Sequence, residues 1–210
     1  MKKSEIVVLV PCHNEMNNFP KIYKKLKKYS LLVVNDFSTD GTKYFLKKNK
    51  IKHINTKKQE GQLNAIIIGF KYIITNFKNC KYVITFDADG EHKPSDLIKF
   101  INKAKLKPDI IMGARNRKNR FLESIISQLF YLKYKIKDPL TGFKMINKML
   151  IKKNLRHLNN KYFFIDFLKR VSSEIKIINI DIASPKRRGY SKHESFITNL
   201  KIFYCLKFLF

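Results

Sequence analysis

The sequence is short of cysteine, of acidic residues and of long apolar runs. Its three cysteines, Cys12, Cys80 and Cys205, share no metal-ligand spacing and cannot all pair, which favours a reduced, cytosolic compartment. No stretch approaches the roughly 20 apolar residues that span a bilayer, and the apolar run at 6–10 is too short for a signal peptide. A chain of 210 residues is long enough to form one domain with a full core, without disulfides or structural metals.

The scarcity of acids leaves the chain strongly basic. Asp and Glu number 16 against 44 Lys and Arg, which gives a formal net charge of +28. Lys supplies 37 of the basic residues and Arg only seven, whereas proteins that read nucleic acids depend on Arg for bidentate contacts. The lysines are spread along the chain beside abundant Ile and Asn, as a coding bias would produce. We therefore expect a solvated surface with no nucleic-acid partner, which can strengthen attraction to anionic lipid head groups.

Strand and helix signals alternate in the first half of the chain. Apolar runs rich in β-branched residues predict strands at 6–10, 31–34, 51–54, 82–86 and 109–112. Apolar residues at helical spacing predict intervening helices at 19–29, 42–46, 61–72 and 95–101. This alternation is typical of βαβ units, so it predicts an α/β fold with a mostly parallel central sheet and helices on both faces.

The alternation breaks down after residue 112. An amphipathic helix is expected at 122–134, followed by a turn at 138–144. A helical run at 162–171 and a last strand at 175–182 complete the predicted elements. No linker, internal repeat or low-complexity insert divides the chain.

Polar clusters follow the carboxyl ends of three predicted strands, at 13–15, 35–40 and 87–92. Because ligands of parallel α/β sheets bind at this edge, we expect the clusters to line one cleft. In the third cluster, Asp87 and Asp89 directly follow a buried run and offer hard oxygen ligands to a divalent cation and the diphosphate that it neutralises. An Asp-x-Asp pair at such a place is also common in plain turns. The occurrence of polar clusters after three separate strands favours a functional site over plain turns.

The order of the motifs resembles the family 2 glycosyltransferases of GT-A fold, over residues 5–195. The motifs are Pro-x-x-Asn-Glu, Asp-x-Ser-x-Asp-Gly-Thr, a Gly-Gln loop, Asp-x-Asp with His and Pro downstream, Gly-x-Arg, Asp-Pro-x-x-Gly-Phe and Gly-x-Ser-Lys. The last two resemble the dolichyl- and polyprenyl-phosphate sugar synthases in particular. The resemblance implies a Rossmann-like GT-A catalytic domain at 1–195. Residues 196–210 would be an amphipathic tail, either packed on the core or lying in the membrane interface.

The resemblance also implies roles for individual residues. The donor-binding residues would be Pro11, His13, Glu15, Asp36, Gly61, Gln62, Asp87, Ala88, Arg187 and Arg188. Asp87 and Asp89 would bind Mg²⁺ or Mn²⁺, with Asp89 the more direct ligand. The catalytic residues would be Asp89, Asp166, Arg115 and Lys192, of which Arg115 and Lys192 would contact phosphate oxygens. The chain departs from the family pattern at Asn35, Glu91 and Lys186, which replace a frequent acid, Gln and Arg.

The activity implied is an inverting, metal-dependent transfer of a sugar from a UDP- or GDP-sugar to polyprenyl phosphate, at the cytoplasmic face of the membrane. The alternative acceptor is a saccharide hydroxyl in cell-envelope polysaccharide synthesis. A lipid phosphate is already anionic, whereas a hydroxyl needs a carboxylate base, for which Asp166 and Asp138 are the candidates. Asp166 is equally well explained as a surface acid paired with Lys169 or Arg170.

Overall fold

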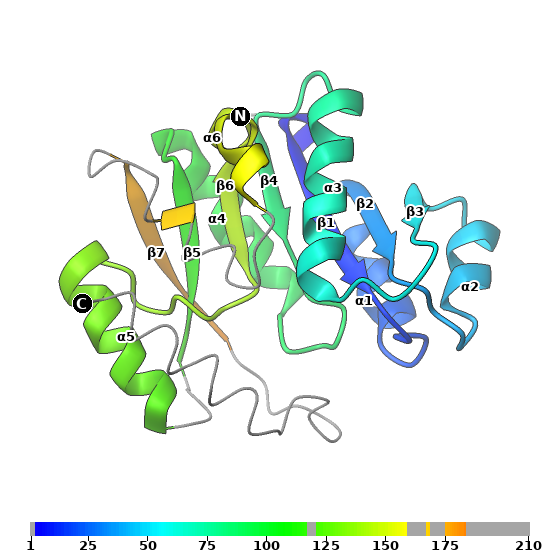
Figure 1. Cartoon of the computed structure of the whole chain (residues 1–210), viewed down its shortest axis with the longest axis horizontal. Helices are drawn as coiled ribbons and strands as arrows, with labels where there is room; N and C mark the ends of the chain where they lie inside the picture. The colour runs from blue at the N-terminus through cyan, green and yellow to red at the C-terminus, as the bar shows by residue number, and fades with distance from the viewer. Residues whose placement is uncertain (1–2, 117–120, 159–166, 169–174, 184–210) are drawn as a thin grey trace.

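The computed structural model describes residues 3–116, 121–158, 167–168 and 175–183. A seven-stranded sheet of order β3-β2-β1-β4-β6-β5-β7 runs through the molecule (Figure 1). Its strands are β1 (Ile6–Cys12), β2 (Ser30–Asn35), β3 (His53–Asn55), β4 (Tyr82–Thr85), β5 (Ile110–Arg115), β6 (Lys144–Asn147) and β7 (Ile177–Ile182). All neighbouring pairs are parallel except those of β6, which runs antiparallel to both β4 and β5. The prediction of a mostly parallel sheet is confirmed.

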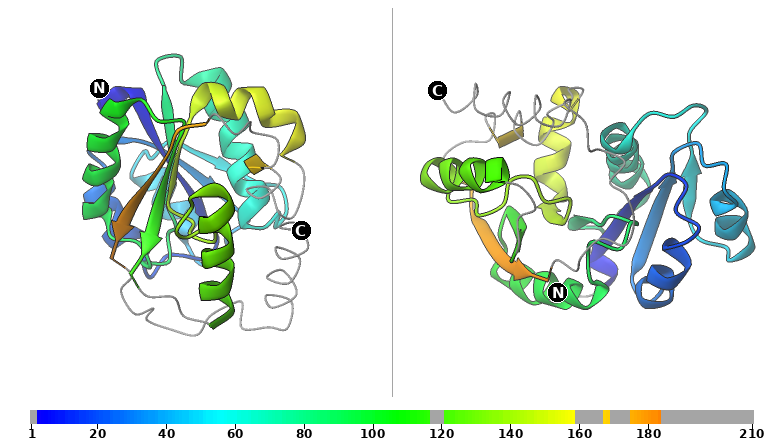
Figure 2. Two further views of the ribbon diagram at one scale, coloured as in Figure 1. Left: turned by 90° about the vertical axis from the view of Figure 1, so that its left-hand side faces the viewer. Right: turned by 90° about the horizontal axis from the view of Figure 1, so that it is seen from below.

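Helices cover both faces of the sheet, as Figure 2 shows. They are α1 (Phe19–Leu26), α2 (Thr42–Lys48), α3 (Gln62–Asn76), α4 (Leu97–Lys103), α5 (Phe121–Tyr134) and α6 (Lys148–Asn154). Short 3-10 turns lie at Lys3–Glu5, Pro94–Asp96, Ala104–Leu106 and Leu155–His157. One hydrophobic cluster joins α3, α5 and α6 to the sheet, and a second joins α1, α2 and α4 to the opposite face.

The alternating side chains of β1 explain why the sheet is covered twice. Val7 and Leu9 belong to the first cluster, whereas Ile6, Val8 and Val10 belong to the second, and all five are at most 1% exposed. Successive side chains of a strand point to opposite faces, so an unbroken apolar run requires an apolar partner on each side. The composition of this one strand thus dictates a three-layer arrangement.

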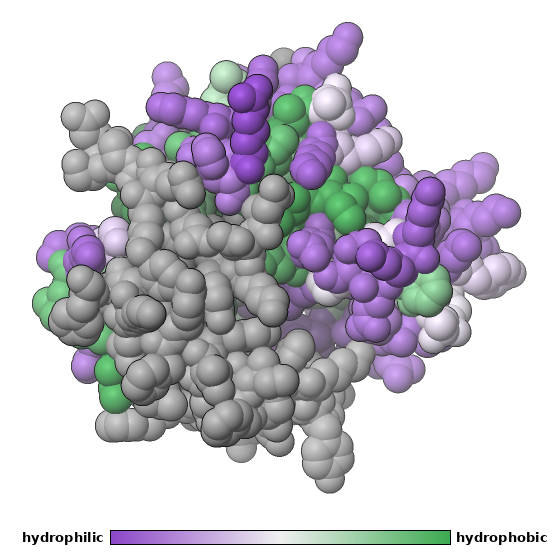
Figure 3. Space-filling view, in the orientation of Figure 1, coloured by the Kyte–Doolittle hydropathy of each residue, from purple (hydrophilic) through white to green (hydrophobic). Residues whose placement is uncertain are grey.

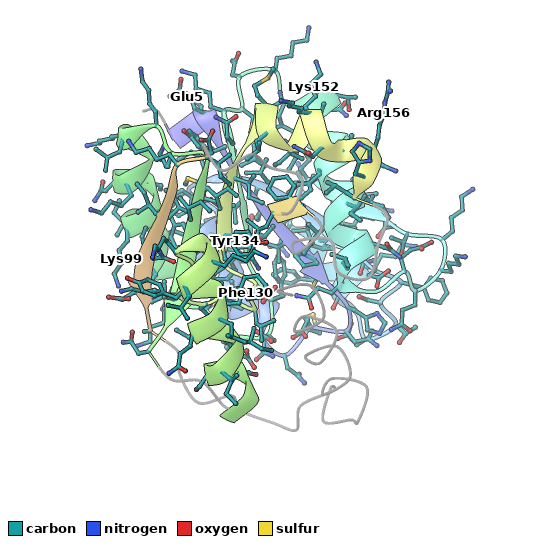
Figure 4. The ribbon with its side chains drawn as sticks, turned by 60° about the vertical axis from the view of Figure 1, so that its left-hand side comes forward. Glu5, Lys99, Phe130, Tyr134, Lys152 and Arg156 are labelled. Atoms are coloured by element: carbon teal, nitrogen blue, oxygen red, sulfur yellow. The ribbon has the colours of Figure 1, made fainter. Side chains whose placement is uncertain are left out.

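Helix α5 packs on the sheet through aromatic side chains. Figure 4 shows Phe130 and Tyr134 side by side on this helix, and their ring centroids lie 5.6 Å apart. Phe130 is 1% exposed, whereas Leu132, on another face of the helix, is 71% exposed. Within the described residues, no helix is both long enough and apolar enough to cross a bilayer.

Several sequence predictions of helices and strands, or of their bounds, need correction. Strand β6 and helix α6 were not expected, because the four residues of β6 follow a turn and lead directly into a helix. The predicted helix at 19–29 ends at Leu26, and the predicted strand at 109–112 extends to Arg115. The third strand begins at His53, two residues later than expected. Most of the helical run at 162–171, and all of the tail at 196–210, lie outside the described residues.

Cys80, just before β4, is buried, and its Sγ lies 3.2 Å from the carbonyl oxygen of Tyr82. Burial raises the pKa of this thiol to about 11. The native state therefore keeps the thiol proton above pH 9, whereas the unfolded chain loses it, so stability must fall as pH rises from 9 to 11.

We expect this thiol to lower the free energy of unfolding by about 2 kcal/mol between pH 8 and pH 10.5. Denaturant titrations of the wild type and Cys80→Ala at both pH values would isolate the effect, since other titrating groups are common to both proteins. The free energy of unfolding of the variant, relative to that of the wild type, should be higher at pH 10.5 than at pH 8. A pH-independent difference would contradict the prediction.

Candidate active site at the carboxyl edge of the sheet

The segments predicted to form a site lie together at the carboxyl edge of the parallel strands. The loop after β1 contacts the loop after β2, since the Met16 backbone N–H donates to Asp40 Oδ2 (2.9 Å). The N-terminus of α3 contacts the loop after β4, where Gln62 Nε2 donates to Asp87 Oδ1 (2.7 Å). Because β6 is antiparallel, its first residue, Lys144, also lies at this edge. Figure 1 shows the edge at the lower end of β1 and β2.

Acidic residues are concentrated at this edge, although the chain as a whole is basic. Nine of the 16 acidic residues belong to its loops and the ion pairs that they form: Glu15, Asp36, Asp40, Glu60, Asp87, Asp89, Glu91, Glu123 and Asp138. Elsewhere hydrophilic side chains are spread over the described surface, as Figure 3 shows for one face. Basic residues lie at the opposite end of the sheet, where Figure 4 labels Lys152 on α6 and Arg156 on the 3-10 turn that follows it. A local excess of carboxylates in such a protein indicates a cation site.

The loops after β1 and β2 hold one another by side-chain to backbone hydrogen bonds. His13 Nδ1 lies 2.5 Å from the carbonyl oxygen of Asp36, and the Asn14 N–H donates to Ser38 Oγ (3.0 Å). Asp40 Oδ1 accepts from the Thr42 hydroxyl (2.6 Å). Burial works against the charge of Asp40, but the hydrogen bonds from Thr42 and Met16 hold the pKa of its carboxyl below the usual value. Asp40 is therefore a structural anion of this edge.

Asp36 organises the loop that precedes α3. Its carboxylate is 2% exposed and accepts from the backbone N–H groups of Glu60 (2.7 Å) and Gly61 (2.8 Å) and from the Thr56 hydroxyl (3.1 Å). Gly61 has φ 85°, a conformation that favours glycine. The donor-binding role that the sequence predicts for Asp36 stays a prediction, and in this structure the carboxylate accepts from the loop. Through that loop it places Gln62 beside Asp87.

Asp87 is held on both carboxylate oxygens. Oδ1 accepts from Gln62, and Oδ2 lies 3.1 Å from His92 Nε2. Burial opposes ionisation, but the hydrogen bond and charge interaction with His92, the charge of Lys144 and the hydrogen bond from Gln62 lower the pKa of Asp87. Asp87 is therefore an ordered anion at neutral pH.

Asp89 lies two residues further along the same loop. Its Oδ1 accepts from the Glu91 N–H (3.0 Å), and the intervening Gly90 has φ 87°. Ala88 between the two aspartates is buried. No group of three His, Cys, Asp or Glu side chains in the described part of the chain could hold a metal ion. Mg²⁺ is usually bound through one or two carboxylates together with substrate phosphates, so Asp87 and Asp89 fit an ion that is shared with a diphosphate.

Arg115, at the end of β5, forms a buried ion pair. Its Nε donates to Asp138 Oδ2 (2.7 Å) and its second terminal nitrogen to Asp138 Oδ1 (3.1 Å), and Glu123 lies 3.5 Å away. Burial would lower the pKa of Arg115, but Asp138 and Glu123 outweigh it and raise the pKa. The sequence assigned Arg115 to phosphate, and in this structure its guanidinium is bound by acids. A bidentate partner also makes Asp138 a poor general base.

Lys144 is a buried cation that the sequence prediction did not include. Burial lowers its pKa to about 8, against the attraction of Asp87 and Asp138. Its Nζ donates to the carbonyl of Thr141, and Thr85 Oγ1 donates to the carbonyl of Gly142 (2.6 Å). The turn at 138–144 is thereby fixed behind Asp87. The Asp-Pro-x-x-Gly-Phe motif marked this turn, but nothing local indicated that the next lysine is buried.

Of the remaining predicted site residues, one lies at the edge of the site and four lie outside the described residues. Pro11 lies on β1 in register with Val34, at the edge of the site. Asp166, Arg187, Arg188 and Lys192 lie outside the described residues, so their assigned roles stay predictions.

The order of elements and the carboxylates at this edge can now be compared with known proteins. The family model described as Glycosyl transferase family 2 matches residues 7–171. The chain belongs to this family. An uncharacterised protein of Methanocaldococcus jannaschii is 31% identical over 169 residues, which cover 70% of this chain and 73% of that protein. The dolichol-phosphate mannosyltransferase of Pyrococcus furiosus is 26% identical over 171 residues, 70% of this chain, and the chain spans about half (47%) of that enzyme's length.

Solved structures share the fold of this family 2 glycosyltransferase. Glucosyl-3-phosphoglycerate synthase from Mycobacterium tuberculosis matches with a TM-score of 0.71 at 15% identity, over 96% of this chain and 78% of that one. Its complex with Mn²⁺, UDP and glucosyl-3-phosphoglycerate matches with a TM-score of 0.70 at 14% identity, over 96% and 78%. These neighbours are GT-A glycosyltransferases. The predicted family, GT-A fold and glycosyltransferase class are confirmed.

Proposed function

We propose that this glycosyltransferase moves a sugar from a UDP- or GDP-sugar to polyprenyl phosphate, with inversion at the anomeric carbon and with Mg²⁺ or Mn²⁺ as cofactor. The observation that carries the proposal is the ordered carboxylate pair Asp87 and Asp89 at the end of β4, in a basic protein that places most of its acids at this edge. Support comes from the similar Pyrococcus furiosus mannosyltransferase and from solved relatives whose complexes contain UDP with Mn²⁺ or Mg²⁺.

The residues of this edge would have separate roles in binding the cation, the nucleoside and the phosphates. Asp89 and Asp87 would hold the cation, which neutralises charge on the departing nucleoside diphosphate when it is bound. The loops with Pro11, His13 and Glu15 would surround the nucleoside. Asp36 would act by holding the Gly61–Gln62 loop, since its carboxylate accepts from that backbone. Arg187, Arg188 and Lys192 would meet phosphate oxygens, as the family pattern implies.

The ion pair of Asp138 favours the lipid phosphate over a hydroxyl acceptor. A hydroxyl must lose its proton to a base, and Asp138, the base candidate that the structure describes, has both oxygens bound by Arg115. A phosphate monoester is already anionic and needs no such base. The alternative, a saccharide hydroxyl acceptor with Asp166 as base, would be favoured if Asp166→Asn abolished turnover while donor binding stayed intact.

We also propose that residues 1–195 form the catalytic domain and that 196–210 form an amphipathic tail. The protein would work in the cytoplasm, bound peripherally to the cytoplasmic face of the membrane. The net charge of +28 supports attraction to an anionic surface. Co-flotation with vesicles that contain phosphatidylglycerol, but not with neutral phosphatidylcholine vesicles, would be the expected result at low salt.

The deciding experiment is nucleoside diphosphate release from a panel of UDP- and GDP-sugars, with and without undecaprenyl phosphate. Release from one donor should require both the lipid and Mg²⁺ or Mn²⁺. Donor binding without lipid-stimulated release would favour the saccharide acceptor. If no donor binds in the presence of either metal, the proposal is wrong.

A further inference from the structure

His92 is buried within the candidate site, although Lys93 beside it is exposed. It is 3% exposed. Its ring centroid lies 5.7 Å from that of Phe86 and 5.1 Å from that of Phe143. Phe100 stacks on Phe143 at 4.3 Å. Three phenylalanines thus form the apolar surroundings of one imidazole.

Only one nitrogen of this imidazole has a partner. Nε2 lies 3.1 Å from Asp87 Oδ2, whereas Nδ1 is buried without a hydrogen bond in the described part of the protein. The bond to a carboxylate requires the proton on Nε2, which leaves Nδ1 as an unpaired acceptor in the neutral ring. Leaving a buried acceptor unpaired costs free energy. A phenylalanine would fill this aromatic pocket without that cost, so packing alone does not account for a histidine here.

The histidine completes the restraint of the Asp87 carboxylate. Gln62 donates to the other oxygen at 2.7 Å. On a further side lies Gly142, where an added Cβ would come within 2.7 Å of Asp87 Cγ. The side chain of Asp87 is therefore fixed by contacts from three separate segments. Outer partners of this kind orient the carboxylates that ligate metals, and their loss typically weakens metal binding 10- to 100-fold.

We propose that His92 is a positioning residue that orients Asp87 toward the bound cation and donor diphosphate. This inference rests on the proposed function, because it assigns Asp87 to the cation site. It predicts that Mn²⁺ affinity depends on a hydrogen-bond donor at position 92, which a histidine that serves packing alone would not require.

The test is His92→Phe in the full chain, with Mn²⁺ and UDP as probes. Phe removes the unpaired Nδ1 but also the Nε2 bond that stabilises the Asp87 carboxylate, so thermal unfolding serves here to verify that the variant is folded. Mn²⁺ binding in the presence of UDP, measured by electron paramagnetic resonance, should weaken about 10- to 100-fold. The matched control is His53→Phe, since His53 lies on β3, bonds to the backbone carbonyl of Ile51 and should leave Mn²⁺ binding unchanged when replaced.

A second variant covers the case in which His92→Phe folds poorly. His92→Gln keeps an amide donor that can reach Asp87, so it should bind Mn²⁺ more tightly than His92→Leu, which has none. Wild-type Mn²⁺ affinity in a folded His92→Phe, or equal affinities in the Gln and Leu variants, would overturn the inference. Failure of the wild type itself to bind Mn²⁺ with either UDP or GDP would instead refute the proposed function.

Discussion

Replacing Asp89 with Asn should lower nucleoside diphosphate release about 100- to 1000-fold while the protein stays folded. The Glu91 N–H donates a hydrogen bond to Asp89 Oδ1, and an amide oxygen can also accept this bond. What Asn cannot supply is the negative charge that a divalent cation needs from a hard oxygen ligand. The loss should therefore fall on catalysis and metal binding, measured by product release and Mn²⁺ titration.

The control for charge is Asp181→Asn. Asp181 lies on β7, with its side chain 70% exposed and 3.4 Å from Lys137. It removes one carboxylate from the same basic protein, at an exposed position near the carboxyl end of β7, where the side chain pairs with Lys137. Its rate of release should match the wild type. Equal losses in the two variants would show that net charge, and not the position of Asp89, governs the rate.

Replacing Asp138 with Asn should destabilise the fold by about 3 kcal/mol, because it leaves the Arg115 guanidinium buried with only part of its compensating charge. The side chain of Asp138 is 1% exposed and that of Arg115 is 10% exposed. Glu123, 3.5 Å from Arg115, remains, but its contact is longer than either bond to Asp138. Denaturant unfolding monitored by circular dichroism would measure the loss.

The exposed pair of Lys137 and Asp181 again provides the comparison. Exposed ion pairs contribute little to stability, so Asp181→Asn should unfold within experimental error of the wild type. The double variant Arg115→Met/Asp138→Leu should recover part of the stability that Asp138→Asn loses, since it removes both buried charges. A fully stable Asp138→Asn that has lost all activity would instead support Asp138 as the base for a hydroxyl acceptor.

Local features of the sequence were sufficient for most of the first half of the fold. The apolar run of β1 specifies a strand buried on both faces, and the Asp and Gly residues after β2 and after β4 specify loops. These are properties of neighbouring residues, so they can be read without knowing what packs against them. The strand ends then placed Asp36, Asp87 and Asp89 at one edge, because parallel strands share their carboxyl ends.

The partners of those residues depended on distant parts of the chain. Asp36 binds backbone groups 24 and 25 residues later, and Arg115 binds Asp138, 23 residues later. Strand β6 was missed because four residues that pair antiparallel between β4 and β5 carry no local signal of that register. Its position is set by the gap that the parallel strands leave, which is a property of the whole sheet.

The sequence by itself determined the family, the α/β architecture and the edge at which the carboxylates gather, because each follows from local pattern and motif order. Tertiary structure alone decided which atoms those carboxylates bind. It assigned Asp36 to a loop, Arg115 to an ion pair and His92 to Asp87. The physical reason is that burial and hydrogen bonding at a site are fixed by side chains that meet only after the chain has folded.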